Sequence, residues 1–293
     1  MNFEKICQDI KKLKIQGAEN VSNAAIQALE LTAKKSRAKN TILFILELDR
    51  AKLKLFTLRP TEPQLRNYLD YILREVKNNA DDKTITQLKK FTITLIQKIL
   101  KDKKQSFKQL GINGAKLIKN NQVIFTHCHS TNVINILKTA KKKITVHNTE
   151  TRPLFQGRKT AKDLSHLKIP VKHFVDSAAR IAIKDSDIAI FGADAITDTK
   201  VFNKVGTEML AIIAKTRRVP VYIATSLWSY DPDQKIVEER SPKEIWKNPP
   251  KGVEIQNFAF EKIPFKLIKG IITEKGILKP KKFVKLAKKL HIS

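Results

Sequence analysis

The sequence predicts an α/β protein in which an N-terminal helical domain precedes a parallel sheet covered by helices on both faces. Through the first 118 residues, apolar side chains recur at about 3.6-residue intervals, the spacing of helices that bury one face. From residue 121 onward, short apolar runs alternate with amphipathic stretches, which is the pattern of strands and helices in a parallel sheet. We therefore divide the chain into a helical domain, residues 1–118, and a sheet domain, residues 119–293.

The helical domain is predicted from a series of amphipathic stretches. They run over residues 1–10, 21–33, 41–56, 65–76 and 85–99. Gly17 ends the first helix, and a Pro-bounded loop between two later helices carries Arg59. A connecting helix over Lys104–Leu117 is expected to break near Gly111 and Gly114 before the sheet begins.

The sheet domain is predicted from apolar, β-favouring runs that alternate with helices. The strand candidates are Val123–Thr126, Lys143–His147, Val171–Val175, Asp187–Phe191, Val219–Ala224 and Gly270–Thr273. The helix candidates are Asn132–Ala140, Thr160–Leu167, Ala178–Ile183 and Glu208–Thr216. Right-handed crossovers place the carboxyl ends of such strands along one rim. This arrangement is Rossmann-like, and open sheets of this kind bind ligands at that rim.

The junction between the first strand and its helix is the most informative stretch. Cys128 follows a buried run that ends at Thr126, and Ser130 and Thr131 can cap the next helix. A cysteine at this place lies beside a helix N-terminus, whose dipole favours thiolate over thiol. A cysteine that packs as a small apolar residue is the alternative, and the stretch alone leaves both readings open.

Polar residues also gather after the other strands. Asp194 directly follows a buried strand, so partial desolvation is expected to raise its pKa. A thiol and a carboxyl group facing each other across the rim suit proton transfer next to a carbonyl. The Glu150, Arg152 and Arg158 group either orients polar substrate groups or forms a surface salt-bridge cluster.

A second candidate site opens the helix after the fourth of these strands. The segment Asn203–Thr207 combines a Gly, the cation Lys204 and free backbone N–H groups at a helix start, which together form an anion site. The alternative is an ordinary Gly-containing turn with Thr207 as the N-cap.

Composition narrows the function classes. The net charge of +29, from 57 basic and 28 acidic residues, would suit a nucleic-acid binder. The lysines are spread along the whole chain without a recognised nucleic-acid motif, so nucleic acid is not an expected partner. No apolar run approaches the roughly 20 residues of a membrane span, and the amphipathic start does not look like a signal peptide. We expect a cytoplasmic protein that does not bind a membrane.

Cofactor motifs are missing from the sequence. The two cysteines, Cys7 and Cys128, give no disulfide framework. His127 and His129 flank Cys128 without a recognised zinc spacing, and strand alternation would point the two His side chains away from the Cys side chain. No metal site is expected. The Walker loop and the Gly-x-Gly-x-x-Gly fingerprint are absent, which argues against a nucleoside triphosphatase or a dehydrogenase.

Six ordered motifs carry a resemblance to a known superfamily. They are Thr126–Ser130, Glu150–Pro153, Gln156–Gly157, Asp176–Ala179, Gly192–Asp194 and Asn203–Thr207. The sequence resembles the superfamily that joins archaeal ribose-1,5-bisphosphate isomerase, methylthioribose-1-phosphate isomerase and the alpha, beta and delta subunits of initiation factor 2B. The likeness is greatest to the archaeal isomerase branch, in which the Cys and Asp of these motifs are catalytic.

The resemblance implies an aldose–ketose isomerase that converts ribose 1,5-bisphosphate into ribulose 1,5-bisphosphate during nucleoside monophosphate degradation. Cys128 would be the base at C2 and Asp194 the acid at oxygen. The implied substrate- and phosphate-binding residues are Gln16, Gly17, Ala18, Arg59, Arg152, Asn203 and Lys204. The resemblance implies no cofactor, with AMP as a candidate activator, and a homodimer or homohexamer built through the C-terminal domain.

The chain departs from the isomerase pattern at two cations. Gln16 stands where the isomerases usually carry Arg, and Ser229 stands where they carry Lys. The substrate could then carry one phosphate, or neighbouring lysines could compensate. The remaining alternative is a non-catalytic subunit of the initiation factor 2B type that binds initiation factor 2 or nucleotides.

Overall fold

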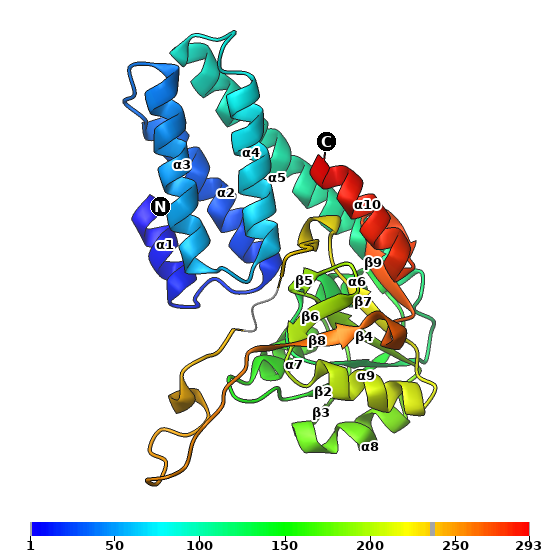
Figure 1. Ribbon diagram of the computed structural model, residues 1–293. Helices are drawn as coiled ribbons and strands as arrows, with labels where there is room; N and C mark the ends of the chain where they lie inside the picture. The colour runs from blue at the N-terminus through cyan, green and yellow to red at the C-terminus, as the bar shows by residue number, and fades with distance from the viewer. Residues whose placement is uncertain (1, 235–237, 293) are drawn as a thin grey trace. The chain divides into compact units, whose positions relative to one another are not determined.

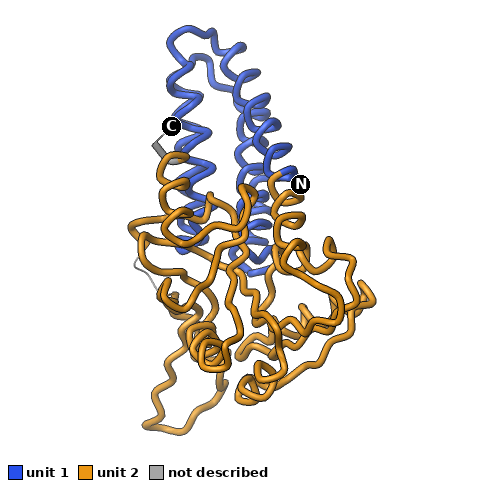
Figure 2. Tube along the Cα trace, turned by 90° about the vertical axis from the view of Figure 1, so that its right-hand side faces the viewer, with its two compact units in different colours: residues 1–105 blue, residues 106–293 orange. Residues whose placement is uncertain are grey.

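The computed structural model describes residues 2–234 and 238–292. The chain forms two compact units, residues 1–105 and residues 106–293, which Figure 2 colours separately. The division falls inside one long helix, α5 (Ile85–Ala115), whereas the sequence-based boundary follows the end of that helix. Each unit is described on its own below.

The first unit is helical, as predicted. It contains α1 (Phe3–Lys11), α2 (Ala18–Lys35), α3 (Thr41–Leu58), α4 (Pro63–Asn78) and the first part of α5. Asparagine side chains cap two of these helices: Asn2 accepts from the N–H of Lys5, and Asn40 accepts from the N–H of Leu43, each at 2.8 Å. Pro63 begins α4, at a position where its missing N–H costs no hydrogen bond.

The predicted break in the connecting helix is wrong, because α5 continues through both glycines to Ala115. A Cβ atom on Gly111 would lie 2.6 Å from the Asn135 side chain of α6 (Thr131–Ala140). A Cβ atom on Gly114 would lie 2.5 Å from the Ile136 side chain. Within the second unit, these glycines therefore permit a close helix–helix approach and do not end the helix.

The second unit is organised around a seven-stranded sheet with the order β10-β9-β7-β4-β1-β2-β3. Figure 1 labels β9, β7, β4, β2 and β3 of this sheet. Its strands are β1 (Val123–Thr126), β2 (Thr145–Thr149), β3 (Val171–Phe174), β4 (Ile188–Gly192), β7 (Val221–Ala224), β9 (Gly270–Thr273) and β10 (Gly276–Leu278). All neighbouring pairs are parallel except β9 and β10, which form an antiparallel pair. The predicted parallel sheet is confirmed, with two strand ranges matched at both ends and the others shifted by one or two residues.

Helices cover both faces of this sheet, as the fold prediction requires. Alternate strand residues enter two separate cores: Phe125 and Phe191 face one, and Ile124 and Ile190 face the other. The aromatic pair meets edge to face, with ring centroids 6.0 Å apart. The remaining helices of the unit are α7 (Gln156–His166), α8 (Ala179–Lys184), α9 (Thr207–Thr216) and α10 (Pro280–Ile292).

A small second sheet was not predicted. It has the order β5-β6-β8, with β5 (Ala195–Ile196), β6 (Lys200–Lys204) and β8 (Phe260–Pro264) in antiparallel pairs. Strand β6 carries polar residues at both ends and β5 has two residues, so neither shows an apolar run long enough to predict a strand. This sheet nevertheless positions the residues that precede α9. Among the described residues, no helix has the length and apolarity that crossing a membrane requires.

Candidate active site

Cys128 lies just beyond the carboxyl end of β1 in a left-handed backbone conformation, with φ = 64°. This region is unfavourable for a residue with a side chain, so the surroundings must hold it. The N–H of Cys128 donates to the Thr151 hydroxyl at 2.9 Å, and its carbonyl accepts from the Thr160 hydroxyl at 2.7 Å. Two threonines from the β2–α7 region therefore fix the cysteine from both sides. Because β1 ends at Thr126, the predicted alternation of the neighbouring histidines does not apply.

His127, the residue before this cysteine, connects the end of β1 to the end of β2 and to the segment that contains Val205. Its Nδ1 lies 2.6 Å from the Thr149 hydroxyl at the end of β2, and its Nε2 lies 3.1 Å from the carbonyl of Val205. Since a carbonyl only accepts, Nε2 carries the proton and Nδ1 accepts from the threonine. Burial lowers the pKa of His127 to about 4, although Asp176 acts in the opposite direction, so the imidazole is neutral at physiological pH.

Burial favours the thiol form of Cys128, against the helix N-terminus, which we expected to favour the thiolate. Burial raises the pKa of Cys128 to about 11, although the residue as a whole is partly exposed. The charges of Lys204 and Arg240 lower this pKa, the N–H of His129 also lowers it, and Asp194 raises it. Desolvation therefore outweighs the effect of the helix N-terminus. Cys128, Lys204, Arg240 and Asp194 therefore lie in one region of the rim.

Asp194 follows β4, the strand that pairs directly with β1. Gly192 ends β4, and a Cβ atom there would lie 2.8 Å from the Ser130 hydroxyl, so the glycine lets the Cys128–Ser130 loop approach the strand. The N–H of Asp194 donates to the carbonyl of Phe202 at 2.9 Å, which fixes the backbone of the acid against β6. The structure brings Asp194 within electrostatic reach of Cys128; their catalytic roles stay a prediction.

The two phosphate-binding candidates in β6 differ in what they can offer. The Asn203 amide donates to the Thr207 hydroxyl at 3.0 Å, so one of its donors is already used inside the protein. Lys204 is only 4% exposed and lies 5.9 Å from the centre of the Phe260 ring. Burial lowers the pKa of Lys204, while Cys128 and Asp194 raise it. Lys204 is therefore a buried cation beside the candidate base.

The predicted anion site at the start of α9 is already filled by a side chain. The carboxylate of Glu261, in β8, accepts from the N–H of Glu208 at 2.5 Å. Burial raises the pKa of Glu261, and the N–H groups of Glu208 and Gly206 lower it. An internal carboxylate thus satisfies the helix terminus that we expected to bind a ligand.

Arg152 and its neighbours form part of the rim above β2 and β3. Arg152 donates from Nη2 to the Ile245 carbonyl at 3.3 Å, and the Asp176 carboxylate accepts from the Arg152 N–H at 2.7 Å. Arg158 pairs with Glu150 at 3.2 Å, so the salt-bridge alternative holds for those two residues. The same Asp176 also accepts from the N–H of Thr151 at 2.9 Å, which holds the loop that positions Cys128.

Four predicted binding residues belong to the first unit. Gln16 is exposed and donates to the carbonyl of Leu13 at 2.5 Å. Gly17 is the N-cap of α2 with φ = 83°, a conformation that favours glycine, and Ala18 begins that helix. Arg59 is buried and pairs with Glu62 at 2.7 Å. Their roles in binding stay predictions.

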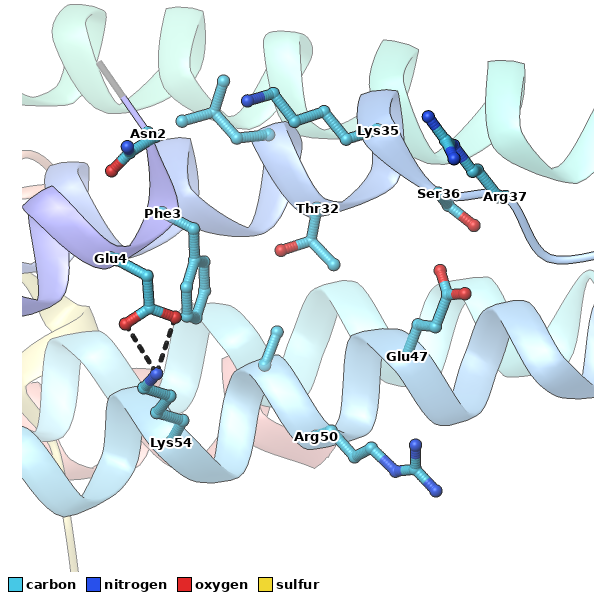
Figure 3. A pocket seen from close by; sticks show the side chains of 12 residues that line it. Asn2, Phe3, Glu4, Thr32, Lys35, Ser36, Arg37, Glu47, Arg50 and Lys54 are labelled. Carbon is cyan, nitrogen blue, oxygen red and sulfur yellow. Dashed lines mark hydrogen bonds and ion pairs between the residues drawn. The ribbon is translucent and has the colours of Figure 1, made fainter.

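The first unit has a pocket that these four residues do not line (Figure 3). It measures about 680 Å³ and is lined by α1, α2 and α3, where Lys54 pairs with Glu4 at 2.7 Å. None of the predicted site residues lines it. Within residues 2–234 and 238–292, no group of three or more His, Cys, Asp or Glu side chains is placed to hold a metal ion.

Arg240 is the charged neighbour of Cys128 that sequence reasoning missed. It lies in the long connection between β7 and β8, in a stretch that carries acidic and basic residues without an apolar period. A sequence of this kind predicts a solvent-exposed loop. Only the tertiary structure shows that the segment lies near the rim.

Known proteins support the family suggested by the motifs. A family model described as "Initiation factor 2 subunit family" matches residues 14–280. Ribose 1,5-bisphosphate isomerase of Thermococcus kodakarensis is 38% identical over 293 aligned residues, which cover 94% of this chain and 90% of that protein. Two crystal structures from Pyrococcus horikoshii OT3 share the fold. 5-Methylthioribose 1-phosphate isomerase has a TM-score of 0.82 at 27% identity, covering 99% of this chain and 88% of that one. Translation initiation factor eIF-2B has a TM-score of 0.82 at 26% identity, with 96% and 98% covered. The superfamily predicted from the motifs is thereby confirmed, and the chain belongs to the initiation factor 2 subunit family.

Proposed function

We propose that this protein is an aldose–ketose isomerase that converts ribose 1,5-bisphosphate into ribulose 1,5-bisphosphate. The observation that carries the proposal is the grouping of Cys128 and Asp194, just beyond the ends of β1 and β4, with Lys204, the last residue of β6. The charges of the acid and the lysine both act on the thiol. The curated relatives that bear the name ribose 1,5-bisphosphate isomerase support the choice of substrate.

The two side chains can perform the whole proton transfer. Asp194, as the acid, gives a proton to the ring oxygen and the C1–O bond breaks. Cys128, as thiolate, takes the proton from C2, and a C1–C2 double bond forms. The C2 hydroxyl then returns a proton to Asp194 and becomes the carbonyl, while C1 takes the proton held by the Cys128 thiol. Both residues end in their starting protonation states, and one hydrogen has moved from C2 to C1.

The resting thiol fits this scheme without an external base. A thiol paired with a carboxylate holds the same number of protons as a thiolate paired with a carboxylic acid. Moving one proton from Cys128 to Asp194 therefore creates the working pair at constant net charge. Lys204 favours the thiolate because its charge lowers the pKa of Cys128.

The substrate-binding and biological assignments complete the proposal. Lys204, Asn203 and Arg152 would bind substrate oxygens. The resemblance implies Gln16, Gly17, Ala18 and Arg59 as further substrate-binding residues. We further propose a cytoplasmic homo-oligomer that acts in nucleoside monophosphate degradation, needs no cofactor and responds to AMP.

The direct test is turnover by the purified protein. Ribose 1,5-bisphosphate and methylthioribose 1-phosphate are supplied in parallel, with and without AMP, and the ketose products are measured. Turnover of the bisphosphate supports the proposal. Turnover of methylthioribose 1-phosphate alone would show a methylthioribose-1-phosphate isomerase instead. No turnover of either sugar would contradict the proposal that the protein is an isomerase.

A second candidate function rests on the likeness to translation initiation factor eIF-2B, whose crystal structure covers 96% of this chain at a TM-score of 0.82. A non-catalytic regulatory subunit would bind initiation factor 2 or nucleotides. Stable co-purification with initiation factor 2, together with inactivity on both sugars, would favour it.

A further inference from the structure

Arg240 is held near the rim by backbone pairing. Its N–H donates to the carbonyl of Asn257 at 2.9 Å, and the N–H of Ala259 donates to the carbonyl of Glu238 at 2.8 Å. The carbonyl of Ala259 in turn accepts from the N–H of Val205 at 3.1 Å. One residue, Ala259, thus connects the segment that carries Arg240 to the chain directly after Lys204.

The same pairing continues into the small sheet. Glu239 and Phe258 form an antiparallel bridge, and two residues later Phe260 lies opposite Lys204 in the β6–β8 ladder. This register fixes the backbone of Arg240 relative to β6, although most of the described residues between β7 and β8 lie outside helices and strands. Arg240 is therefore a positioned residue and not a freely moving loop cation.

The guanidinium group of Arg240 retains donors that the protein does not use. Its side chain is only 11% exposed, and its Nε lies 2.9 Å from the Glu238 carboxylate. Among the residues that the structure describes, no acceptor is recorded for its two Nη atoms, which carry four N–H donors. A largely buried cation with several unused donors is costly unless an anion completes its contacts.

A second cation lies in the same region. Lys204 is 4% exposed, and within the described parts of the chain its ammonium group has no recorded ion pair or hydrogen bond. The charge of Arg240 lowers the pKa of both Lys204 and Cys128. Asp194 and Glu244 offset part of this positive charge at Lys204, and Glu238 offsets part of it at Arg240.

We infer that Arg240 binds a phosphate group of the substrate together with Lys204. A guanidinium fork can contact two phosphate oxygens at once, while the lysine adds a compact charge. The inference deepens the proposed function and rests on it for the identity of the sugar phosphate. It adds a binding residue that the resemblance does not assign, in a chain that carries Gln16 and Ser229 at two positions where the isomerases usually have cations.

Arg240→Ala and Arg240→Lys test the inference, and Lys251→Ala is the matched control, since it removes an exposed cation from the same connection. With ribose 1,5-bisphosphate, we expect KM to rise roughly 10- to 100-fold in Arg240→Ala, with a smaller change in kcat, because one charge-assisted contact is lost. The KM of Arg240→Lys should lie between those of Arg240→Ala and the unsubstituted protein. The KM of Lys251→Ala should equal that of the unsubstituted protein. Far-UV circular dichroism and thermal unfolding check that each variant is folded.

A second readout needs no turnover. In a Cys7→Ser background, iodoacetamide labels Cys128 alone, and inorganic phosphate at increasing concentration should slow the labelling. Arg240→Ala should need about 10-fold more phosphate for half-protection, while Lys251→Ala should not. If this shift appears in a protein that turns over no sugar, the phosphate contact stands and the proposed function fails. Equal phosphate protection and equal KM in Arg240→Ala, or no protection of the unsubstituted protein, would overturn the inference.

Discussion

The N–H of Cys128 donates a 2.9 Å hydrogen bond to the hydroxyl of Thr151, a residue that follows a neighbouring strand of the sheet. The Thr151 hydroxyl also lies 3.3 Å from Nδ1 of His127, and Asp176 accepts from the Thr151 N–H. The conformation of the candidate base is thus set by contacts across the rim. A left-handed cysteine at this place is a property of the assembled sheet.

Thr151→Val should weaken the site without removing a reacting group. The valine keeps the shape but leaves the partly buried N–H of Cys128 without its acceptor, which costs about 1–3 kcal/mol in unfolding free energy. We expect kcat to fall at least about 10-fold, because Cys128 is no longer held in its conformation. Urea unfolding and steady-state kinetics measure the two effects. Thr216→Val, at an exposed helix end, is the control; equal kinetics in both variants would show that Thr151 does not position the base.

Gly192→Ala should displace the loop that carries Cys128. The added Cβ would meet the Ser130 hydroxyl at 2.8 Å and the Ser130 Cβ at 2.9 Å, and both are too close. We expect a loss of about 1–3 kcal/mol in stability and a large drop in kcat. Adding Ser130→Gly removes the contacting atoms and should restore part of the activity. A double variant no better than the single one would place the effect elsewhere.

Much of the second unit can be predicted from the sequence, for a definable reason. Central strands such as Val123–Thr126 and Gly270–Thr273 are buried on both faces, so each appears as a short apolar run with clear limits. The rim positions of Cys128 and Asp194 follow from where such runs end. The left-handed conformation of Cys128 could not be predicted, because it depends on Thr151 and Thr160, which are distant in the chain.

The missed features share one physical cause. Glu261, in β8, fills the start of α9. An isolated bridge beside the small sheet, between Glu239 and Phe258, holds the Arg240 segment near the rim. No apolar periodicity marks a strand in either segment. The glycines of α5 looked like helix breakers, since local propensity cannot reveal that α6 packs against them. Tertiary contacts decided each of these cases.

The thiol of Cys128 should titrate well above a free cysteine. Burial raises its pKa to about 11, so in a Cys7→Ser background the iodoacetamide rate should still be rising at pH 10. Asp194→Asn removes a charge that raises this pKa and should move the rate profile to lower pH. Lys204→Met should move it to higher pH. Asp185→Asn, an exposed acid on another loop, should leave it unchanged. A plateau near pH 9 would contradict the burial of the sulfur.

His127 should make the fold sensitive to acid. Its folded-state pKa of about 4 lies below the unfolded value near 6.5, so the unfolded chain binds more protons between these values. The stability from neutral His127 is complete above pH 6.5 and is lost as the pH falls towards 4, by up to about 3 kcal/mol. Urea unfolding across this range measures the slope. His166→Gln, which is exposed, should keep it, and His127→Gln should reduce it; an unchanged slope in His127→Gln would contradict a neutral, buried imidazole.

Self-association should use the face formed by α8 and α9, which lie side by side in the second unit (Figure 1). Three large apolar side chains of these two helices are roughly half exposed: Ile181, Met209 and Ile212. Such a patch favours an interface, so light scattering should give at least twice the 33.4 kDa chain mass. Ile181→Asp with Ile212→Asp should yield monomers, whereas Ile42→Asp in the first unit should not. A monomeric unsubstituted protein would contradict this.

The central claim is that Cys128 and Asp194 carry out one proton transfer together, and kcat of the paired variants on ribose 1,5-bisphosphate tests it most directly. We predict that Cys128→Ser and Asp194→Asn each lower kcat by about 10²- to 10⁴-fold, and that the double variant is little worse than either, since the two residues act as a unit. Wild-type kcat in either folded single variant would contradict the claim.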